Sequence, residues 1–441
     1  MARKFQNGIF YNDNVIHSKK SLRNYKDTYN NTFAILFFRI RKKSTKDQIV
    51  QSLEKLWIMY QNLKKGIIED LPHQRVPPGS LSVTLGYGQN IFKLNDIKKS
   101  IPRDFDNSQF CSPKKLGGGF ILEGSHLSYS KDIYENVGLD EDIVFQFIAN
   151  SQLAVYRAIV ETWKNLRQNS LSKHPLVFSK FFTGFQRDDG RSWLGFHDGV
   201  SNMRPGKERR NIIAIHKENN ELVPRDFWTE NGTYMAFLRI EIDLDLWESI
   251  NRSKQELIIG REKLYGRPLV GVDKFNNPIT SKKFPTAQKI IAYSKRYHDH
   301  PDYFKAPKLL SKKIMSKIDI DKSFKVLNES HIGRTRHFDK INNKLISSRR
   351  IYRQTFEFIE SNYLSKKFLK VGLNFLSFQN DPARLLFILT DPNWLGNSSF
   401  GGDSQFKGID KLLNVQACGI FYIPQIEKQF PGSCIFKQNS K

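Results

Sequence analysis

The first part of the chain alternates between two hydrophobic periods. Residues 32–40, TFAILFFRI, form a short apolar and aromatic run bounded by polar residues, which is typical of a buried strand. Thr45 and Gln48 then have the spacing of a helix capping box. Apolar side chains follow at helical intervals, at Ile49, Leu53, Leu56, Tyr60 and Leu63. The pattern therefore predicts a buried strand followed directly by an amphipathic helix.

The same kinds of element continue through residue 185. Residues 80–88, SLSVTLGYG, alternate apolar and polar positions, which predicts a half-buried strand. Residues 178–185, FSKFFTGF, predict a further strand. Between them the spacing predicts a second amphipathic helix, whose apolar positions are Leu153, Tyr156, Ile159, Val160 and Trp163.

The strand at the start of the chain has a counterpart 200 residues later. TYMAFLRI (233–240) carries Phe, Arg and Ile at the same offsets as FAILFFRI (33–40). The matching pairs are Phe37 with Phe237, Arg39 with Arg239 and Ile40 with Ile240. Three matches in eight positions do not exclude chance, so the order of the elements that follow decides the interpretation.

That order is again strand, helix and strand. GLNFLSF (372–378) predicts a buried strand, a helix is expected from Asp381, and ACGIFYIP (417–424) predicts a final strand. We therefore expect an α+β protein of two similar halves, residues 1–190 and 191–441. The lysine-rich stretch from about 273 to 330 suits a long connection better than a domain.

Charge and cysteine content narrow the class of protein. The 70 basic and 44 acidic residues give a net charge of +26, which would suit nucleic acid or an anionic membrane. The lysines are scattered along the chain, however, as on a solvated surface, so we expect no nucleic-acid partner. No apolar run has the ~18 residues that a membrane span needs. Three cysteines without a CxxC pair, and no apolar or twin-arginine signal at the N-terminus, lead us to expect a cytoplasmic protein.

One acidic residue stands out because of the glycines around it. In GFHDGVSNMRP (195–205), Asp198 follows His197 and lies between Gly195 and Gly199. Such glycines indicate either a backbone with positive φ or the close approach of something bulky. Ordinary turn chemistry is the alternative explanation, since aspartate before glycine commonly bonds its own backbone.

Two further segments combine charge with an unusual setting. His331 precedes two arginines in ESHIGRTRH (329–337), which suits either anion recognition or a surface loop. Arg353 lies in an apolar and aromatic frame, where a cation is costly unless it meets a carboxylate or an anionic ligand. YHDHPD (297–302) offers two histidines and two aspartates, but it lacks the spacing of a metal site.

Taken in order, these segments resemble the dye-decolourising (DyP-type) peroxidase family. The resemblance covers most of the chain and rests on FQNGI, TLGYG, GFHDG, NGTYMAFLRIEIDLDLW, IGREKLYGRPL, SHI, the arginine segment, LNFLSFQNDPAR and GIFYIP. GxxDG alone is weakly specific, whereas the whole set in this order is highly specific. The family implies two ferredoxin-like domains, with antiparallel sheets and flanking helices, that enclose haem b (iron protoporphyrin IX).

The resemblance assigns the residues nearest the iron. Asp198 matches the distal acid, and His331 matches the proximal ligand of the metal. Arg353, 22 positions after His331, matches the distal arginine, although neighbouring Arg349 and Arg350 leave that register open.

Four other residues would surround the haem by the same resemblance. Arg334 would contact a propionate, Phe375 and Phe378 would line the pocket, and Asp381 would accept the other N–H of the proximal imidazole. The chain departs from the family at Gly333, where arginine is common. The propionate contacts are therefore open to Arg334 or Arg336.

The family implies a haem-dependent peroxidase. It would reduce hydrogen peroxide through a high-valent iron-oxo intermediate and oxidise dyes or phenolic and aromatic reductants. Asp198 would move a proton between the peroxide oxygens, and Arg353 would stabilise the charge that develops as the O–O bond breaks. Because a carboxylate stays ionised further into acid than an imidazole, we expect an acidic optimum. Bulky dyes would react at surface tyrosines or tryptophans, and Trp193 is the nearest in sequence to Gly195.

Two alternatives remain at this point. A haem-binding or haem-handling protein could use the same pocket without peroxidase turnover, and a basic RNA-associated protein is the third reading. The sequence leaves open the physiological reductant, a homo-oligomer and any encapsulating partner.

Overall fold

Most of the regular structure belongs to one large sheet. The computed structural model describes residues 5–6, 32–106, 128–129, 141–168, 174–187, 190–198, 202, 207–216, 224–264, 266, 269–272, 278–280, 330–331, 339–341, 344–346, 350–362, 368–385 and 412–437. Nine strands follow one another in the order β2-β4-β1-β5-β11-β12-β6-β13-β3, and β2 also pairs with β13. Eight of these strands therefore form a closed ring.

The first half contributes four antiparallel strands and two long helices. In chain order they are β1 (Thr32–Ile40), α1 (Lys46–Leu63), β2 (Ser82–Tyr87), β4 (Ile143–Ala149), α4 (Gln152–Gln168) and β5 (Leu176–Phe185). Their order in the sheet is β2-β4-β1-β5. The fourth, first, third and second strands thus lie side by side, which is a ferredoxin-like arrangement.

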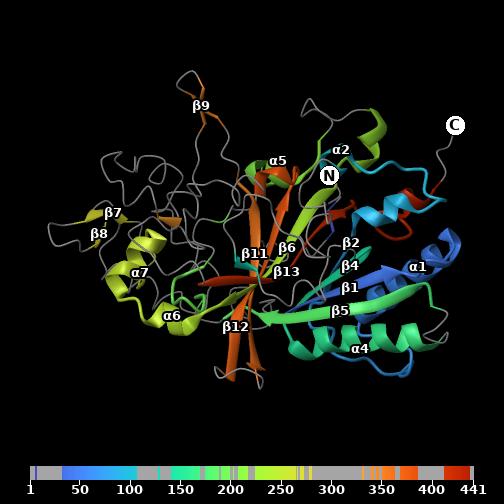
Figure 1. The fold of residues 1–441 in the computed structure, drawn as a ribbon. Helices are drawn as coiled ribbons and strands as arrows, with labels where there is room; N and C mark the ends of the chain where they lie inside the picture. Colours follow the sequence, from blue (N-terminus) through green and yellow to red (C-terminus); the bar gives the residue numbers. More distant parts are fainter. Residues whose placement is uncertain are drawn as a thin grey trace, which may run out of the picture.

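The second half repeats this arrangement. Its strands are β6 (Thr233–Ile242), β11 (Tyr352–Asn362), β12 (Phe368–Gln379) and β13 (Leu413–Ile423), with α6 (Leu244–Glu248) and α7 (Arg252–Ile259) after β6. The order β11-β12-β6-β13 matches that of the first half. The predicted α+β class of two similar halves is confirmed (Figure 1). The predicted boundary at residue 190 falls in the connection between the two strand sets.

Shorter elements lie around these two sets. They are η4 (Gln89–Lys93), α2 (Arg103–Asp106), β3 (Ser128–Tyr129), α5 (Lys207–Ile213), η6 (Pro224–Thr229), β7 (Leu269–Val272), β8 (Pro278–Thr280), β9 (Asp339–Ile341), β10 (Lys344–Ile346) and η10 (Ser433–Phe436). The predicted connection from 273 to 330 falls almost wholly outside the described residues, as does most of the helix expected from Asp381. None of the helices in the described ranges combines the length and hydropathy that a membrane crossing requires.

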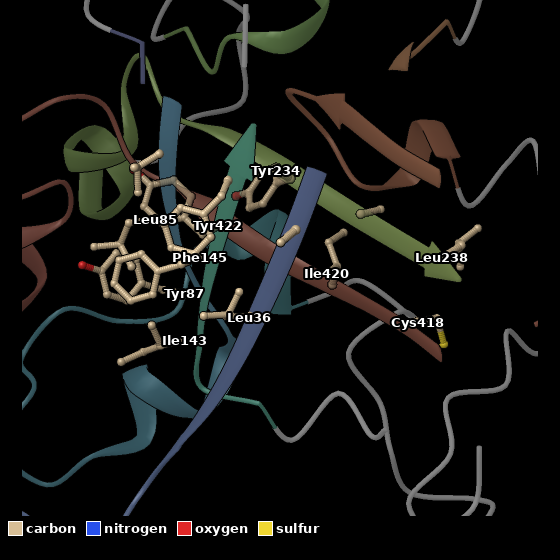
Figure 2. Close-up of a cluster of buried hydrophobic side chains, with 14 of the residues drawn as sticks. Leu36, Leu85, Tyr87, Ile143, Phe145, Tyr234, Leu238, Cys418, Ile420 and Tyr422 are labelled. Carbon is tan, nitrogen blue, oxygen red and sulfur yellow. The ribbon is translucent and has the colours of Figure 1, made fainter. Parts of the chain in front are cut away.

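The ring closes through two single pairs of residues. Phe185 of β5 pairs with Glu357 of β11, and Tyr87 of β2 pairs with Tyr422 of β13. Closure separates an inner core from an outer core, because successive strand side chains point to opposite faces. Figure 2 shows part of the outer core, where Tyr87 and Tyr422 belong to one cluster of buried side chains.

Aromatic rings fill the inner core. The repeated residues Phe37 and Phe237 meet there, with ring centroids 5.5 Å apart, and Phe33 stacks on Phe356 at 4.4 Å. Arg239 is also almost fully buried, and it donates to Asn374 at 2.9 Å and pairs with Glu360 at 2.5 Å. Of the three repeated pairs, Phe37 and Phe237 share the inner core, whereas Arg39 is half exposed and Arg239 is buried.

Local sequence signals specified the first helix well. Thr45 and Gln48 form both bonds of a capping box at the start of α1. The buried residues of α1 are the five that the periodicity predicted, Ile49, Leu53, Leu56, Tyr60 and Leu63. β2 differs from its prediction, since all of its residues are buried rather than alternate ones. Closure of the ring covers the second face of this strand.

The second long helix is present, but its buried face differs from the predicted one. α4 buries Ala154, Val155, Ala158 and Leu166, while Leu153, Tyr156, Val160 and Trp163 are exposed. The helix contacts β1 and β4. Ala154 and Ala158 allow a close approach to the sheet, Val155 and Leu166 share their buried face, and of the predicted positions only Ile159 is partly buried against the core.

The N-terminal segment reinforces the closure of the ring between β2 and β13. The fully buried Gln6 donates to the carbonyls of Leu85 (2.9 Å) and Pro424 (3.0 Å) and accepts from the Leu85 amide (2.7 Å). It thereby joins β2 to the residue that follows β13.

Replacing Gln6 with alanine should destabilise the protein by about 2–4 kcal/mol, because three buried backbone groups lose their partner. Urea denaturation followed by circular dichroism measures this change. As a control, Gln48→Ala removes an amide of similar size from an exposed helix cap and should lower the stability by less than about 1 kcal/mol. Equal effects of the two substitutions would contradict the bridging role.

Candidate functional site

The loop that contains Asp198 is a tight hairpin. The Ser192 amide donates to Phe196 at 2.9 Å, and the Asp198 amide donates to Gly190 at 3.0 Å. Gly195 has a φ of +83°, which a residue with a side chain rarely adopts. A Cβ at this position would lie 2.4 Å from Cε of Lys263. Gly195 is therefore required by the positive φ of the turn, whereas the flexible Lys263 side chain could move aside for a Cβ.

Arg191 fastens this hairpin to the turn after α7. Its guanidinium donates to the carbonyls of Gly195, Lys263 and Leu264, each at 2.7 Å. Trp247 of α6 adds a bond to the carbonyl of Leu194 at 3.1 Å. The GFHDG and IGREKL motifs, more than 60 residues apart in sequence, thus form one unit. Arg191 was not among the predicted site residues.

The other side of the loop is pinned to β11. Thr355 donates its hydroxyl hydrogen to Oδ2 of Asp198. Asn202 brackets the backbone of Arg353, since its Nδ2 donates to the Arg353 carbonyl at 2.6 Å and its Oδ1 accepts from the Arg353 amide at 3.1 Å. Residues two apart on a strand share a face, so Arg353 and Thr355 both present their side chains on one side of β11. Asp198 and Arg353 are in this way brought to the same place.

His331 completes this group with an imidazole that stays neutral. Its Nδ1 is buried, although the residue as a whole is partly exposed. Burial lowers the pKa of His331 to about 3, and the guanidinium groups of Arg353 and Arg261 contribute to the lowering. Arg261 is itself buried and donates to the carbonyl of Gly266 at 2.7 Å. A neutral imidazole is the form that binds a metal.

The two predicted pocket phenylalanines lie on opposite faces of the sheet. Phe375 pairs with Thr355 across the β11–β12 ladder and packs against the outer core. Phe378 pairs with Tyr352 and belongs to the inner core. Paired residues of an antiparallel ladder point to the same face, so Phe375 lies on the side of Asp198 and Arg353 whereas Phe378 does not.

The remaining predicted residues are less closely connected to this group. Asp381 begins the turn after β12, where its Oδ1 accepts from the Ala383 amide at 2.8 Å, a local bond typical of a turn aspartate. Arg350 lies two residues before the start of β11 and is partly buried. Arg334, Arg336 and Arg349 lie outside the described residues.

The donor set limits which kind of metal the site could take. Among the described residues, no three or more histidine, cysteine or acidic side chains gather as a metal would require. Residues 297–302, whose spacing did not favour a metal site, lie outside them. A metal bound through His331 alone would have to bring its other ligands with it, as an iron porphyrin does. The neighbouring arginines and Phe375 suit an anionic, largely apolar macrocycle.

Solved structures define the class of fold. Ferric DtpA from Streptomyces lividans superposes with a TM-score of 0.62 at 17% identity, covering 94% of this chain and 95% of DtpA. A DyP-type peroxidase from Cellulomonas bogoriensis gives 0.60 at 16% identity, covering 93% of this chain and 94% of its own. At these identities the similarity establishes a common fold.

A family model then identifies the chain. The model described as Dyp-type peroxidase, C-terminal, matches residues 189–428, more than half of the sequence. The protein therefore belongs to the Dyp-type peroxidase family, as the motifs indicated. A curated relative, the deferrochelatase of Escherichia coli, is 22% identical over 199 residues. That alignment spans 44% of this chain and 42% of the relative, so it covers less than half the length of either protein.

The buried imidazole makes the stability of the ligand-free chain depend on pH. The pKa of His331 is about 3 in the folded chain, against about 6.5 for an unfolded histidine, so protons bind preferentially to the unfolded chain below pH 6.5. The stabilisation is complete above pH 6.5 and is lost as the pH falls toward 3. Lowering the pH from 6.5 to 5 should cost roughly 2 kcal/mol through this residue.

Urea denaturation of the ligand-free chain at pH 6.5 and pH 5 measures the effect. His331→Gln, which does not titrate, serves as the reference, because carboxylates elsewhere titrate equally in both proteins. The wild type should lose more stability than the variant over this interval. Equal losses of stability in the wild type and the variant would show that the folded chain accommodates a protonated His331.

Proposed function

We propose that the protein is a haem-dependent peroxidase that reduces hydrogen peroxide and oxidises dyes or phenolic and aromatic reductants, with an acidic optimum. The observation that carries the proposal is that the Asp198 loop is hydrogen-bonded to β11 beside Arg353, while the charge of Arg353 acts on the neutral imidazole of His331. These three residues come from a hairpin, a strand and a separate segment, respectively. Membership of the Dyp-type peroxidase family supports the same reaction.

The residues of this group suit haem b. His331 would bind the iron, and Phe375 would contact the porphyrin from the outer face of β12. Arg334 remains our proposal for a propionate contact, and the buried Arg261 is a second cation in range of His331. A DypB variant from Rhodococcus jostii with the same fold was solved in complex with heme, at a TM-score of 0.53 and 14% identity. Haem, when bound, supplies the iron that accepts the oxidising equivalents of peroxide.

Asp198 would act as the proton shuttle. Its carboxylate would take the proton from the inner oxygen of the peroxide and return it to the departing oxygen. The hydroxyl of Thr355 holds Oδ2, which fixes the orientation of the carboxylate. The two hydrogen bonds from the Asn202 side chain fix the backbone of Arg353. The charge of Arg353 would stabilise the negative charge that develops as the O–O bond of the peroxide breaks.

Substitutions at the three residues should give different defects. Asp198→Ala should slow the reaction with peroxide by about 10²–10⁴-fold, and Arg353→Leu by about 10²–10³-fold, with haem retained in both. His331→Ala should lose the haem, seen as absence of the Soret band. Stopped-flow mixing with peroxide measures the rates.

Phe378→Leu is a matched control for these variants, because this ring faces the inner core. It should lower the thermal stability and leave the peroxide rate within about twofold. Full peroxide reactivity in Asp198→Ala would exclude the shuttle role.

A haem-handling function is the second candidate, because the curated relatives are named deferrochelatase. Anaerobic incubation with hemin distinguishes the two functions. Release of iron would appear as the fluorescence of free protoporphyrin, whereas a peroxidase should retain intact haem and react with added peroxide. Porphyrin fluorescence without peroxide turnover would contradict the peroxidase proposal and support the haem-handling function.

A further inference from the structure

Exposed apolar side chains form a stripe along the outer side of α4 (Figure 1). Leu153, Tyr156, Val160 and Trp163 are between 40% and 61% exposed. They recur at intervals of three and four residues, so they follow one side of the helix over about three turns. The stripe points away from the core, because the buried side chains of α4 lie on its other side. Nothing in the reaction proposed above uses this surface.

The strand β5 extends the apolar surface beyond the helix. Phe181 of β5 is also exposed, and it pairs with Leu36 of β1 in the sheet. Leu36 belongs to the same buried cluster as Ala154 and Ala158, through which α4 approaches the sheet. Paired residues of an antiparallel ladder point to the same face, so Phe181 lies on the face of the sheet that α4 covers.

A cleft of about 550 Å³ opens at the N-terminal end of the stripe. Tyr156 lines it together with Gln152 of α4, the end of β5 and Phe358 of β11. It lies next to the pair Phe185 and Glu357, where the two halves of the ring meet. A side chain that fills a pocket is a typical anchor of a protein interface. The stripe therefore leads into a place where such an anchor could bind.

Two arginines without an acidic partner border the stripe. The guanidinium of Arg157 donates to a backbone carbonyl at 3.1 Å, and that of Arg167 lies 4.5 Å from the ring centre of Trp163. Within the described ranges, neither of these arginines pairs with a carboxylate. The nearby acid, Glu161, is already paired with Lys164. The edges of the stripe therefore suit a negatively charged partner.

A second copy of the chain does not suit this surface. Two stripes packed against each other would bring Arg157 and Arg167 of both copies into one interface. Glu161 is already paired, so it would not neutralise them. Like charges at an interface cost free energy, and each copy carries a net charge of +26.

A lipid surface suits the stripe less well than a protein does. An anionic bilayer would attract the two arginines, but it contacts the side chains that protrude from a helix. The cleft is recessed beside the stripe, so a bilayer would leave it unfilled. A side chain of a protein partner can occupy it.

We propose that the α4 stripe, Phe181 and the cleft together bind an acidic amphipathic helix of a partner protein. The apolar side of that helix would lie along the stripe, and its acidic residues would meet Arg157 and Arg167. One large apolar side chain of the helix would enter the cleft. The inference goes beyond the proposed peroxidase reaction and does not depend on it.

Fluorescence anisotropy of a labelled synthetic peptide with the full-length, haem-containing protein tests the proposal. The probe is a peptide of about five helical turns, with leucine and one phenylalanine at helical intervals and glutamate elsewhere. A peptide of the same composition in scrambled order is the reference. The amphipathic peptide should bind about tenfold more tightly than the scrambled one, because only its order of residues matches the stripe.

Substitutions locate the binding surface. Val160→Glu should weaken binding of the amphipathic peptide about tenfold, because it places a like charge in the middle of the stripe. Ile58→Glu is the matched control and should leave the affinity within about twofold. Ile58 is a half-exposed apolar residue of the other long helix, α1, and it does not line the cleft. Arg157→Gln and Arg167→Gln should each weaken binding by about twofold to fivefold.

Several outcomes would overturn the proposal. These are equal binding of the two peptides, or equal affinities of the wild type and Val160→Glu. Vesicles of phosphatidylglycerol and sedimentation equilibrium test the other occupants. Vesicle binding or self-association that Val160→Glu abolishes would assign the face to lipid or to a second copy instead.

Failure of this proposal and failure of the proposed function are distinguishable. A protein that does not reduce peroxide would refute the proposed function, while anisotropy would still report whether the face binds the acidic helix. Circular dichroism of each variant establishes that it is folded.

Discussion

The hydrogen bonds between the Asp198 loop and β11 are the constraint on which the candidate site depends. Thr355 holds the carboxylate of Asp198, and Asn202 holds the backbone of Arg353. A carboxylate and a guanidinium interact strongly only when their separation is fixed, because flexible charged side chains lose conformational entropy on pairing. Here the strand supplies the fixed frame. Arg191 provides a second anchor by joining the same loop to the turn after α7.

Closure of the sheet decides on which side a cofactor could lie. Aromatic rings such as Phe37, Phe237 and Phe356 fill the inner core. The inner core therefore cannot serve as a binding site. The outer face of the second half carries Arg353, Thr355 and Phe375 instead. Burial there also keeps the imidazole of His331 neutral, as a metal ligand must be. One architectural feature thus governs both the location of the site and its protonation state.

The junction of the two halves is the second place where closure matters. β5 and β11 meet in a single residue pair, and the cleft lies beside it. Two strands that diverge beyond one pair leave space between them, and the side chains around that space come from both halves. The same junction carries Trp193 and Gln186, which link it to the loop of Asp198. The loop of Asp198 is therefore supported from this junction as well.

Local signals in the sequence were sufficient for several elements. The capping box and the buried stripe of α1 were both predicted, because each depends on residues within a few positions of one another. The ordered set of motifs was also sufficient to indicate the family and to single out Asp198, His331 and Arg353. Their roles remain proposals. On α4 four of the five predicted positions are exposed and only Ile159 packs against the core, since that helix has apolar residues on two faces and periodicity does not rank them.

By itself, then, the sequence determined the elements, the repeat of two halves and the chemically distinctive residues, because these are properties of short segments and their order. The tertiary structure alone decided which groups meet. Thr355 and Asn202 lie more than 150 residues from their partners, and Arg191 holds a turn about 70 residues away. The pairing register likewise placed Phe375 and Phe378 on opposite faces. Alternation along a strand gives two faces, but only the packing of the closed sheet determines which of them is the interior.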